Sequence, residues 1–215
     1  MPQTGTLKIT PEQRGAALDH AAERATPYAY GITYNDGGAG NLDVEFTATS
    51  RCSFFRVAYP AGEKALLFLE AGREKEGGSI EIDPVNNEIR ICNRERHDSH
   101  LGPRLYNLKG CYVLRFSQPF AACGTWNGTT VDAGSRRACG ASAGGYVEFA
   151  PGTELVEIRI GSSFIDFEQA AENLDREIPA GESFATVRDR VRDQWARALE
   201  KVTRKGASEE DMHIF

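Results

Sequence analysis

The chain has 215 residues, of which 40% are hydrophobic and 26% are charged, as is typical of a globular protein with a sizeable buried core. The formal net charge of −6 argues against a nucleic-acid-binding protein, which needs a basic face, and against binding to an anionic membrane surface. No apolar run reaches the roughly 18 residues of a membrane helix, and the N-terminal segment lacks the apolar core of a signal peptide.

The first predicted elements are a helix and a strand. Thr10, Pro11 and Gln13 match a helix start with an N-cap, a proline at the first helical position and a capping-box glutamine. Helix propensity extends this element to about residue 24. Residues 28–34 are predicted to form a strand. The Asn-Asp-Gly-Gly sequence that follows them is a strong hairpin signal and leads into the next strand.

The clearest strand signal covers residues 42–60. Hydrophobic and polar residues alternate at its start, which predicts an antiparallel strand with one face buried and the other in water. Ser50 and Arg51 interrupt the alternation, and a second run, rich in aromatic and β-branched residues, covers residues 52–59. Two adjacent strands of this kind predict an antiparallel sheet.

Further strands are predicted along the middle of the chain. Their ranges are residues 64–69, 79–83, 88–92 and 111–117, with a hairpin joining the second and third. Pro119 lacks a backbone donor, so the segment after it is expected at a sheet edge. Residues 124–144 are rich in small residues without periodicity, which predicts a long exposed loop. Residues 145–150 and 154–161 are predicted to be the last two strands, paired with each other around a Pro-Gly turn.

The C-terminal part is predicted to be helical. Asp166 caps a helix that runs to about residue 173, and Ser183 caps a longer helix. Hydrophobic residues recur in the second helix at spacings of three and four, which predicts one apolar face. They are Phe184, Val187, Val191, Trp195, Leu199 and Val202. We expect Trp195 to pack this helix onto the sheet. A capping box at residues 208–211 predicts a further helix that the chain does not complete.

One group of cysteines and histidines resembles a metal site. Cys92, His97, His100 and Cys111 have the spacing C-x4-H-x2-H-x10-C, whereas zinc sites use tighter pairs. We therefore favour a polar loop with two strand cysteines over a zinc site. A Cys–His nucleophile is disfavoured as well, because no orienting third group is identified. The chain has five cysteines and no C-x2-C pair, which does not predict a disulfide framework.

Several segments carry a family resemblance. EFTATSR at residues 45–51, followed by FFR and YP, is similar to the ELTATxR…HRYTFP segment of glycoside hydrolase family 92, the calcium-dependent exo-α-mannosidases. HAAERATPY resembles the family's HxxExAxPGYY segment, and GCYVLRFSQPF resembles the strand that ends in FSKPF. GSSFIDFEQAAENLDREI resembles VGISYVSxEQAxxNLxxEI, and WARAL resembles the WNxxL linker helix. These matches occur in the family's order and cover nearly the whole chain.

The resemblance implies a fold and a division into domains. The family pairs an N-terminal β-sandwich with a C-terminal (α/α)6 barrel. We therefore expect a mainly β fold, with an antiparallel, galactose-mutarotase-like β-sandwich over residues 1–163 and linker helices over residues 164–215. The family's general acid, its water-activating aspartates and most of its calcium ligands lie in the barrel. We accordingly expect a chain truncated at both ends, with the catalytic barrel beyond Phe215 and no cofactor or metal bound by this chain.

The resemblance also implies a function. It predicts the non-catalytic, carbohydrate-associated N-terminal domain of an α-mannosidase that acts on N-glycans, inert as an isolated fragment. Its expected partners are a mannose-containing glycan and the (α/α)6 catalytic domain, with no nucleic acid and no membrane. Two alternatives stay open: a free-standing carbohydrate-binding module, and a structural subunit that docks on a separately encoded barrel. Members of the family are commonly secreted or periplasmic, but also intracellular.

Three residues are candidates for carbohydrate binding. Trp126 lies in the predicted glycine-rich loop, where it suits a sugar-stacking platform and a plug at the edge of the sandwich equally well. His20 and Glu23 are expected to hydrogen-bond to each other on one helical face, and their family position leaves a role beside the sugar open. No pair of acidic residues matches the family's catalytic positions, so no catalytic residue is predicted.

Overall fold

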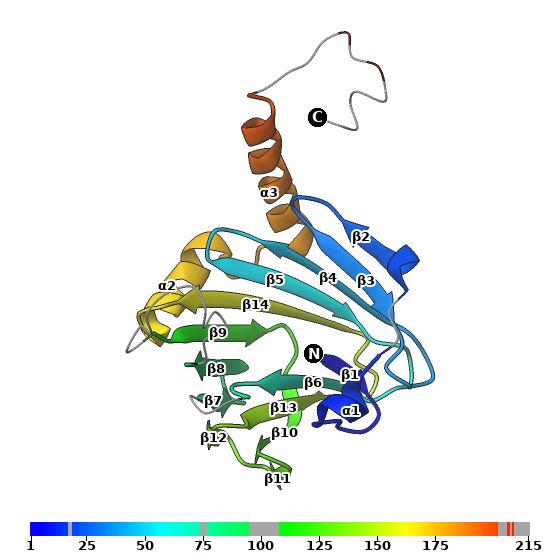
Figure 1. Cartoon of the computed structure of the whole chain (residues 1–215), viewed down its shortest axis with the longest axis vertical. Helices are drawn as coiled ribbons and strands as arrows, with labels where there is room; N and C mark the ends of the chain where they lie inside the picture. The colour runs from blue at the N-terminus through cyan, green and yellow to red at the C-terminus, as the bar shows by residue number, and fades with distance from the viewer. Residues whose placement is uncertain (17–18, 74–76, 95–107, 202–205, 207, 209–215) are drawn as a thin grey trace.

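The computed structural model of the chain describes residues 1–16, 19–73, 77–94, 108–201, 206 and 208. They form two stacked antiparallel sheets of nine and five strands, with the two C-terminal helices packed on the larger sheet (Figure 1). This architecture confirms the predicted antiparallel β-sandwich followed by helices. Among the described helices, none combines the length and the apolar character needed to cross a membrane.

The larger sheet contains, in spatial order, β12 (Arg137–Gly140), β7 (Gly78–Asp83), β8 (Glu88–Asn93), β9 (Gly110–Phe116), β14 (Leu155–Ser163), β5 (Cys52–Ala58), β4 (Leu42–Ala48), β3 (Tyr30–Tyr34) and β2 (Glu23–Ala25). The smaller sheet contains β1 (Pro2–Thr4), β6 (Ala65–Glu70), β13 (Ala143–Phe149), β10 (Phe120–Asn127) and β11 (Thr130–Ala133). The helices are α1 (Pro11–Arg14), α2 (Phe167–Glu177) and α3 (Phe184–Leu199), with a 3-10 turn η1 (His20–Ala22).

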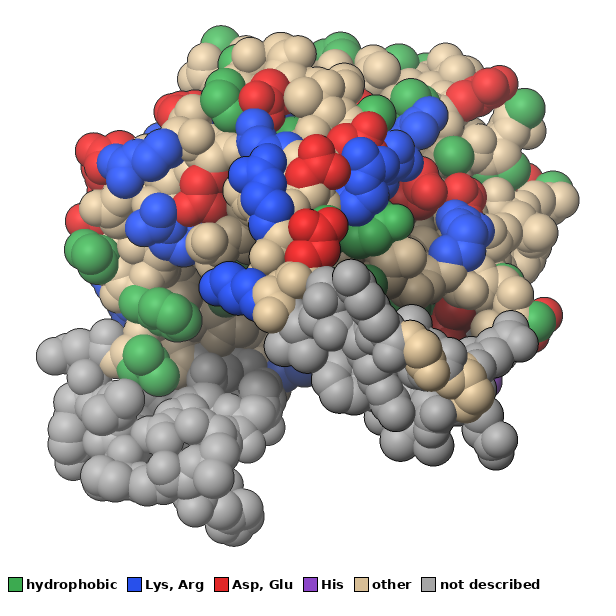
Figure 2. Space-filling model, turned by 90° about the horizontal axis from the view of Figure 1, so that it is seen from above, with side chains coloured by type: hydrophobic (Ala, Val, Ile, Leu, Met, Phe, Trp, Pro, Cys, Tyr) green, Lys and Arg blue, Asp and Glu red, His purple; other side chains and the backbone are tan. Residues whose placement is uncertain are grey.

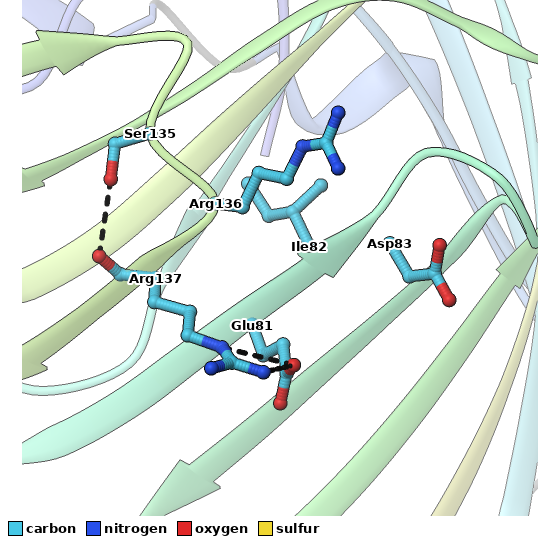
Figure 3. Close-up of a pocket in the computed structure, with 6 residues that line it drawn as sticks. All are labelled: Glu81, Ile82, Asp83, Ser135, Arg136 and Arg137. Carbon is cyan, nitrogen blue, oxygen red and sulfur yellow. Dashed lines mark hydrogen bonds and ion pairs between the residues drawn. The ribbon is translucent and has the colours of Figure 1, made fainter.

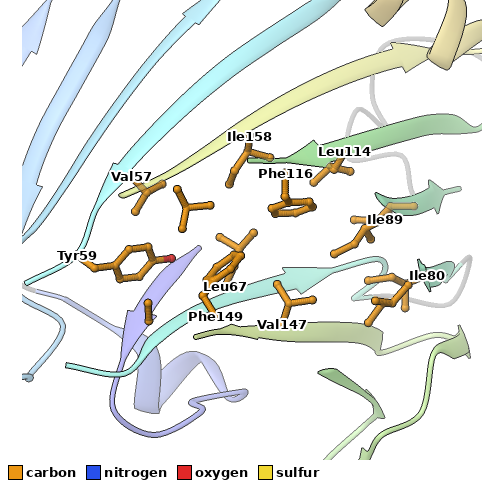
Figure 4. Close-up of a cluster of buried hydrophobic side chains, with 14 of the residues drawn as sticks. Val57, Tyr59, Leu67, Ile80, Ile89, Leu114, Phe116, Val147, Phe149 and Ile158 are labelled. Atoms are coloured by element: carbon orange, nitrogen blue, oxygen red, sulfur yellow. The ribbon is translucent and has the colours of Figure 1, made fainter. Parts of the chain in front are cut away.

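The main hydrophobic core lies between the two sheets (Figure 4). Alternate residues of the strands point into it, because successive side chains of a strand face opposite sides. Val57 and Val156 lie opposite each other in the larger sheet, and Val147 joins the same core from the smaller one, all three buried. The alternation predicted at the start of residues 42–60 holds in β4, where Leu42 is buried in the core and Val44 packs against it.

The N-terminal helix is much shorter than predicted. The side chain of Thr10 makes no capping hydrogen bond, and α1 ends at Arg14, because Gly15 takes an extended conformation. The segment predicted to continue the helix instead forms η1 and then β2, which pairs with β3. Pairing with the sheet edge prevails over local helix propensity at this point.

The region predicted as a long loop contains strands. β10 continues to Asn127, and β11 and β12 follow before β13 begins. Its small residues allow close packing rather than disorder: a Cβ atom on Gly144 would lie 2.0 Å from the indole of Trp126 on the neighbouring strand. The edge position expected after Pro119 does not hold for all of β10, because its second half pairs with β11 as well as with β13.

The pairing predicted for the last two strands is wrong. β13 pairs with β6 and β10 in the smaller sheet, whereas β14 pairs with β5 and β9 in the larger one. The Pro-Gly turn between β13 and β14 therefore crosses from one sheet to the other. A sharp turn is visible in the sequence, but the sheet that the chain joins after it depends on partners elsewhere in the fold.

The two C-terminal helices follow the predicted caps. Asp166 accepts a hydrogen bond from Gln169 N at 2.8 Å, and Ser183 accepts one from Thr186 N at 3.1 Å. Helix α2 passes close to β14: a Cβ atom on Gly161 would lie 2.2 Å from the carbonyl oxygen of Ala170. The helices enclose a second core on the outer face of the larger sheet, formed by Cys52, Phe54, Leu174, Ile178, Phe184, Val187 and Val191.

Candidate functional site

Three aromatic side chains form a row across β3, β4 and β5. Tyr30 lies opposite Phe46, and Phe46 lies opposite Phe55, so all three share the inner face of the larger sheet. The ring centroids of Tyr30 and Phe46 are 5.6 Å apart, and those of Phe46 and Phe55 are 5.0 Å apart. Phe55 packs against the main core, and each of the three is partly exposed. We call these residues the aromatic row.

Polar groups extend the aromatic row at the β2 end. The hydroxyl of Tyr30 donates to Glu23 Oε1 at 2.6 Å, and the other oxygen of Glu23 lies 3.0 Å from Nδ1 of His20. The His20 side chain is 83% exposed. Aromatic faces beside a carboxylate and an imidazole offer both apolar contact and hydrogen bonds, the combination that orients polar ligands in binding sites.

Hydrogen bonds shift the pKa values of Glu23 and Tyr30 in opposite directions. The bond from Tyr30, followed by the one from His20, lowers the pKa of Glu23, and the same Tyr30–Glu23 bond raises the pKa of Tyr30. Glu23 is therefore a carboxylate at neutral pH. A general acid needs the opposite shift, because it must hold its proton until it protonates the leaving group. The direction of this pKa shift therefore argues against a general-acid role for Glu23.

The structure places the three candidate residues in different surroundings. His20 and Glu23 are hydrogen-bonded as predicted, but they lie on η1 and β2 rather than on one helix. Trp126 is 4% exposed and stacks on Phe68, with ring centroids 4.6 Å apart. Its ring faces are not open to a sugar, which favours the structural alternative. The sequence analysis missed the aromatic row, although Tyr30, Phe46 and Phe55 already stood within predicted strands.

The opposite face of the same strands carries ion pairs. Arg24 Nη2 lies 2.8 Å from Asp43 Oδ1 and 3.8 Å from Glu45 Oε1, and Arg56 approaches Glu45 from β5. Burial tends to raise the pKa of Asp43, but hydrogen bonds from Arg24 and Thr33 outweigh it and hold the pKa below its usual value. Figure 2 shows basic and acidic side chains interspersed on the face of the molecule seen from above. These carboxylates are engaged with neighbouring cations.

A surface pocket of about 500 Å³ lies between β7 and the turn before β12 (Figure 3). Its lining residues are Glu81, Ile82, Asp83, Ser135, Arg136 and Arg137. Arg137 points at Glu81, and its Nε lies 3.0 Å from Glu81 Oε1. The pocket has no aromatic lining residue for a sugar ring, and Arg137 and Glu81 within it are paired with each other, so the aromatic row is the better binding candidate.

The described part of the chain brings no three histidine, cysteine, aspartate or glutamate side chains together as a metal site requires. Of the zinc candidates, Cys92 and Cys111 lie opposite each other on β8 and β9. His97 and His100 lie outside the described residues, as does the helix predicted from residue 209.

Helix α3 presents a second candidate surface. Phe184, Val187 and Val191 are buried against the sheet, but Trp195, on the same apolar stripe, is 44% exposed. The prediction that Trp195 packs on the sandwich is therefore wrong. Figure 1 shows the reason, because the second half of α3 extends past the strands. Leu199 is exposed next along the stripe, and so are Phe164 and Ile165 before α2.

Residues 1–163 match the model of the glycosyl hydrolase family 92 N-terminal domain. The chain is 32% identical to the family GH92 inverting mannosidase BT2199 from Bacteroides thetaiotaomicron VPI-5482, with a TM-score of 0.86 over 97% of this chain and 27% of that one. It is 20% identical to the family GH92 α-mannosidase BT3965 from Bacteroides thetaiotaomicron, with a TM-score of 0.77 over 96% of this chain and 29% of that one.

A bacterial glucoamylase solved with acarbose shares the fold at 10% identity, with a TM-score of 0.56 over 81% of this chain and 27% of that one. No curated protein matches the chain. The chain spans between a quarter and a third of the length of these solved structures. The family match over residues 1–163, together with the similarity to BT2199, shows that the chain belongs to glycoside hydrolase family 92 and corresponds to its N-terminal domain.

Proposed function

We propose that this chain serves as the non-catalytic N-terminal domain of an α-mannosidase that acts on mannose-containing N-glycans. The observation that carries the proposal is the change along α3 from buried to exposed apolar residues. Val187 and Val191 attach the helix to the sandwich, and Trp195 and Leu199 continue the same stripe without cover among the described residues. A further domain docked there would remove these side chains from water, which stabilises the assembly.

The mannosidase BT2199 supports this assignment, because about three quarters of that protein lies outside the part that this chain covers. Inverting hydrolysis needs one protonated and one ionised carboxyl group, roughly 6.5–9.5 Å apart. Glu23 is held ionised by Tyr30 and His20, and Asp43 is paired with Arg24. We therefore assign catalysis, and the calcium expected from the family resemblance, to a partner domain rather than to these residues.

The isolated chain, supplied with calcium, is expected not to hydrolyse an aryl α-mannoside. It is also expected to bind the part of BT2199 that it does not cover, produced as a separate polypeptide. Trp195→Asp should abolish that complex in gel filtration, because it places a charge in an apolar contact. Arg197→Asp is the matched control, because Arg197 is exposed and lies two residues after Trp195, on the other side of α3.

Two results would contradict the proposal. One is turnover of the mannoside by the pure chain that disappears when one of its own acidic residues is replaced. The other is a complex whose affinity is the same with tryptophan and with aspartate at position 195, which would place the docking surface elsewhere.

The aromatic row favours a second candidate function, direct binding of a mannose-containing glycan by this chain. The solved structures of BT3965 include a complex with mannoimidazole, a ligand of that protein. In this chain, the rings of Tyr30 and Phe46 in the aromatic row are partly exposed, and Glu23 with His20 offers polar groups beside them. A pyranose ring, apolar on its faces and polar at its edge, fits that combination.

Replacing Tyr30 with alanine is expected to weaken binding of a mannose oligosaccharide roughly fivefold, or about 1 kcal/mol, because it removes one ring and the bond to Glu23. Titration followed by NMR measures the affinity and reports folding in the same spectra. Arg24→Ala is the control, since Arg24 lies on the opposite face of the adjacent strand. If Tyr30→Ala and Arg24→Ala bound the oligosaccharide with equal affinity, or if the wild-type chain did not bind it, the proposal of direct glycan binding would be excluded.

A further inference from the structure

Two cysteines face each other across β8 and β9. Cys92 lies directly opposite Cys111, and their exposed fractions are 8% and 1%. In these strands Ile91 and Leu114 point into the main core. Because neighbouring residues of a strand point to opposite faces, both cysteine side chains lie on the other face, the one on which α2 packs.

The hydrogen-bond pattern shows which kind of pair they form. Asn87 accepts a hydrogen bond from Phe116 N at 3.1 Å, and these residues extend the register of β8 and β9 by one position. Hydrogen-bonded and non-hydrogen-bonded pairs alternate along an antiparallel ladder. Counting from Asn87, Cys92 and Cys111 form a non-hydrogen-bonded pair.

The other neighbour of β8 gives the same result. Arg94 N donates to Gly77 O at 3.2 Å, which makes the pair of Cys92 with Ser79 on β7 a hydrogen-bonded one. The backbone N–H and C=O of a strand residue point to the same side, so Cys92 forms its backbone hydrogen bonds with β7 and not with β9. Non-hydrogen-bonded pairs bring Cα atoms to about 4.5 Å, within the range of about 4.4–6.8 Å that a disulfide spans.

The two thiols also interact directly. Burial, followed by the proximity of Cys92 and a hydrogen bond with its side chain, raises the pKa of Cys111. Both cysteines are free thiols in this structure. The other three lie opposite residues that are not cysteine: Cys52 opposite Gly161, Cys123 opposite Val147 and Cys139 opposite Ser79. Among the described cysteines, only this pair is placed for a bond within the sheet.

We propose that Cys92 and Cys111 are a redox modification site that forms a reversible cross-strand disulfide by exchange with a small disulfide such as oxidised glutathione. Cys92 is the more exposed of the two, so its thiolate attacks first, forms a mixed disulfide and releases one glutathione thiol. Cys111 then loses its proton and attacks the Cys92 sulfur, which releases the second thiol. Two cysteine thiols are oxidised, and one glutathione disulfide is reduced to two thiols. The disulfide links β8 covalently to β9, on the face of the sheet on which α2 packs.

Peptide mapping of the full chain tests the proposal. The chain is incubated with oxidised glutathione, its remaining thiols are alkylated, and it is digested with trypsin without reductant. Cleavage after Arg90, Arg94, Lys109 and Arg115 releases ICNR and GCYVLR. We expect these peptides to be joined by a disulfide and to separate on reduction. The urea midpoint of the oxidised chain should exceed that of the reduced chain, because the cross-link restricts the unfolded state.

Two variants make the test specific. Cys139→Ser should keep the joined peptides, because Cys139 is exposed and lies on another strand. Cys111→Ser should abolish them and leave Cys92 as a mixed disulfide with glutathione. Alkylation of both cysteines in the treated wild-type chain, mixed disulfides alone, or links to other cysteines would each overturn the proposal. The wild-type map decides the question by itself if Cys111→Ser does not fold.

Discussion

Replacing Phe184 with alanine is expected to lower the free energy of unfolding by about 3–5 kcal/mol, the usual cost of truncating a buried aromatic side chain. Phe184 begins α3 and is 4% exposed. Its ring meets Phe54 of β5 edge to face, with centroids 5.6 Å apart. The alanine variant leaves a cavity between the helix and the sheet, at the point where α3 is attached.

Trp195→Ala is the matched comparison on the same helix. Its side chain is partly in water, so we expect its removal to change the free energy of unfolding by less than about 0.5 kcal/mol in this chain. Urea unfolding of both variants, followed by circular dichroism, measures the difference. Equal losses would mean that α3 packs on the sandwich along its whole length, and no exposed surface would remain for a partner domain.

Replacing Trp126 with alanine is expected to have an effect of similar size, about 3–5 kcal/mol. The indole stacks on Phe68 with an angle of 13° between the rings, and Leu7 and Ile9 of the N-terminal segment pack against the same cluster. Its edge fills the space above Gly144 on β13. Truncation would expose this cluster and loosen β10 from its neighbour.

Val131→Ala is the control for Trp126. Val131 lies directly opposite Trp126 on β11 but is exposed, so its truncation should cost little. Trp126→Phe should cost less than alanine because it keeps a ring on Phe68, and it should leave glycan affinity unchanged. A folded Trp126→Phe chain that had lost glycan binding would restore the sugar-stacking alternative and contradict the structural role.

The aromatic row shows how far local patterns reach in this protein. Tyr30, Phe46 and Phe55 all lie within strands that the sequence predicts, at residues 28–34, at the start of residues 42–60 and at residues 52–59. Their meeting depends on the register of three strands, in which Tyr30 reaches Phe46 and Phe46 reaches Phe55. Register is a relation between segments, and no single segment encodes it. The same holds for Cys92 and Cys111, which the sequence places in two predicted strands but which only the register of β8 and β9 sets opposite each other.

What the sequence by itself determined is local or familial: the strands at residues 42–60, the caps Asp166 and Ser183, and membership of the family. The tertiary structure alone decided which sheet β13 and β14 join, that Trp126 is covered, and that Trp195 is not. The physical reason is that periodicity and caps report the backbone of one segment, whereas burial depends on what packs above it. Trp126 stands among small residues and Trp195 on an apolar helix stripe, and only the neighbours supplied by the fold decide which of them is buried.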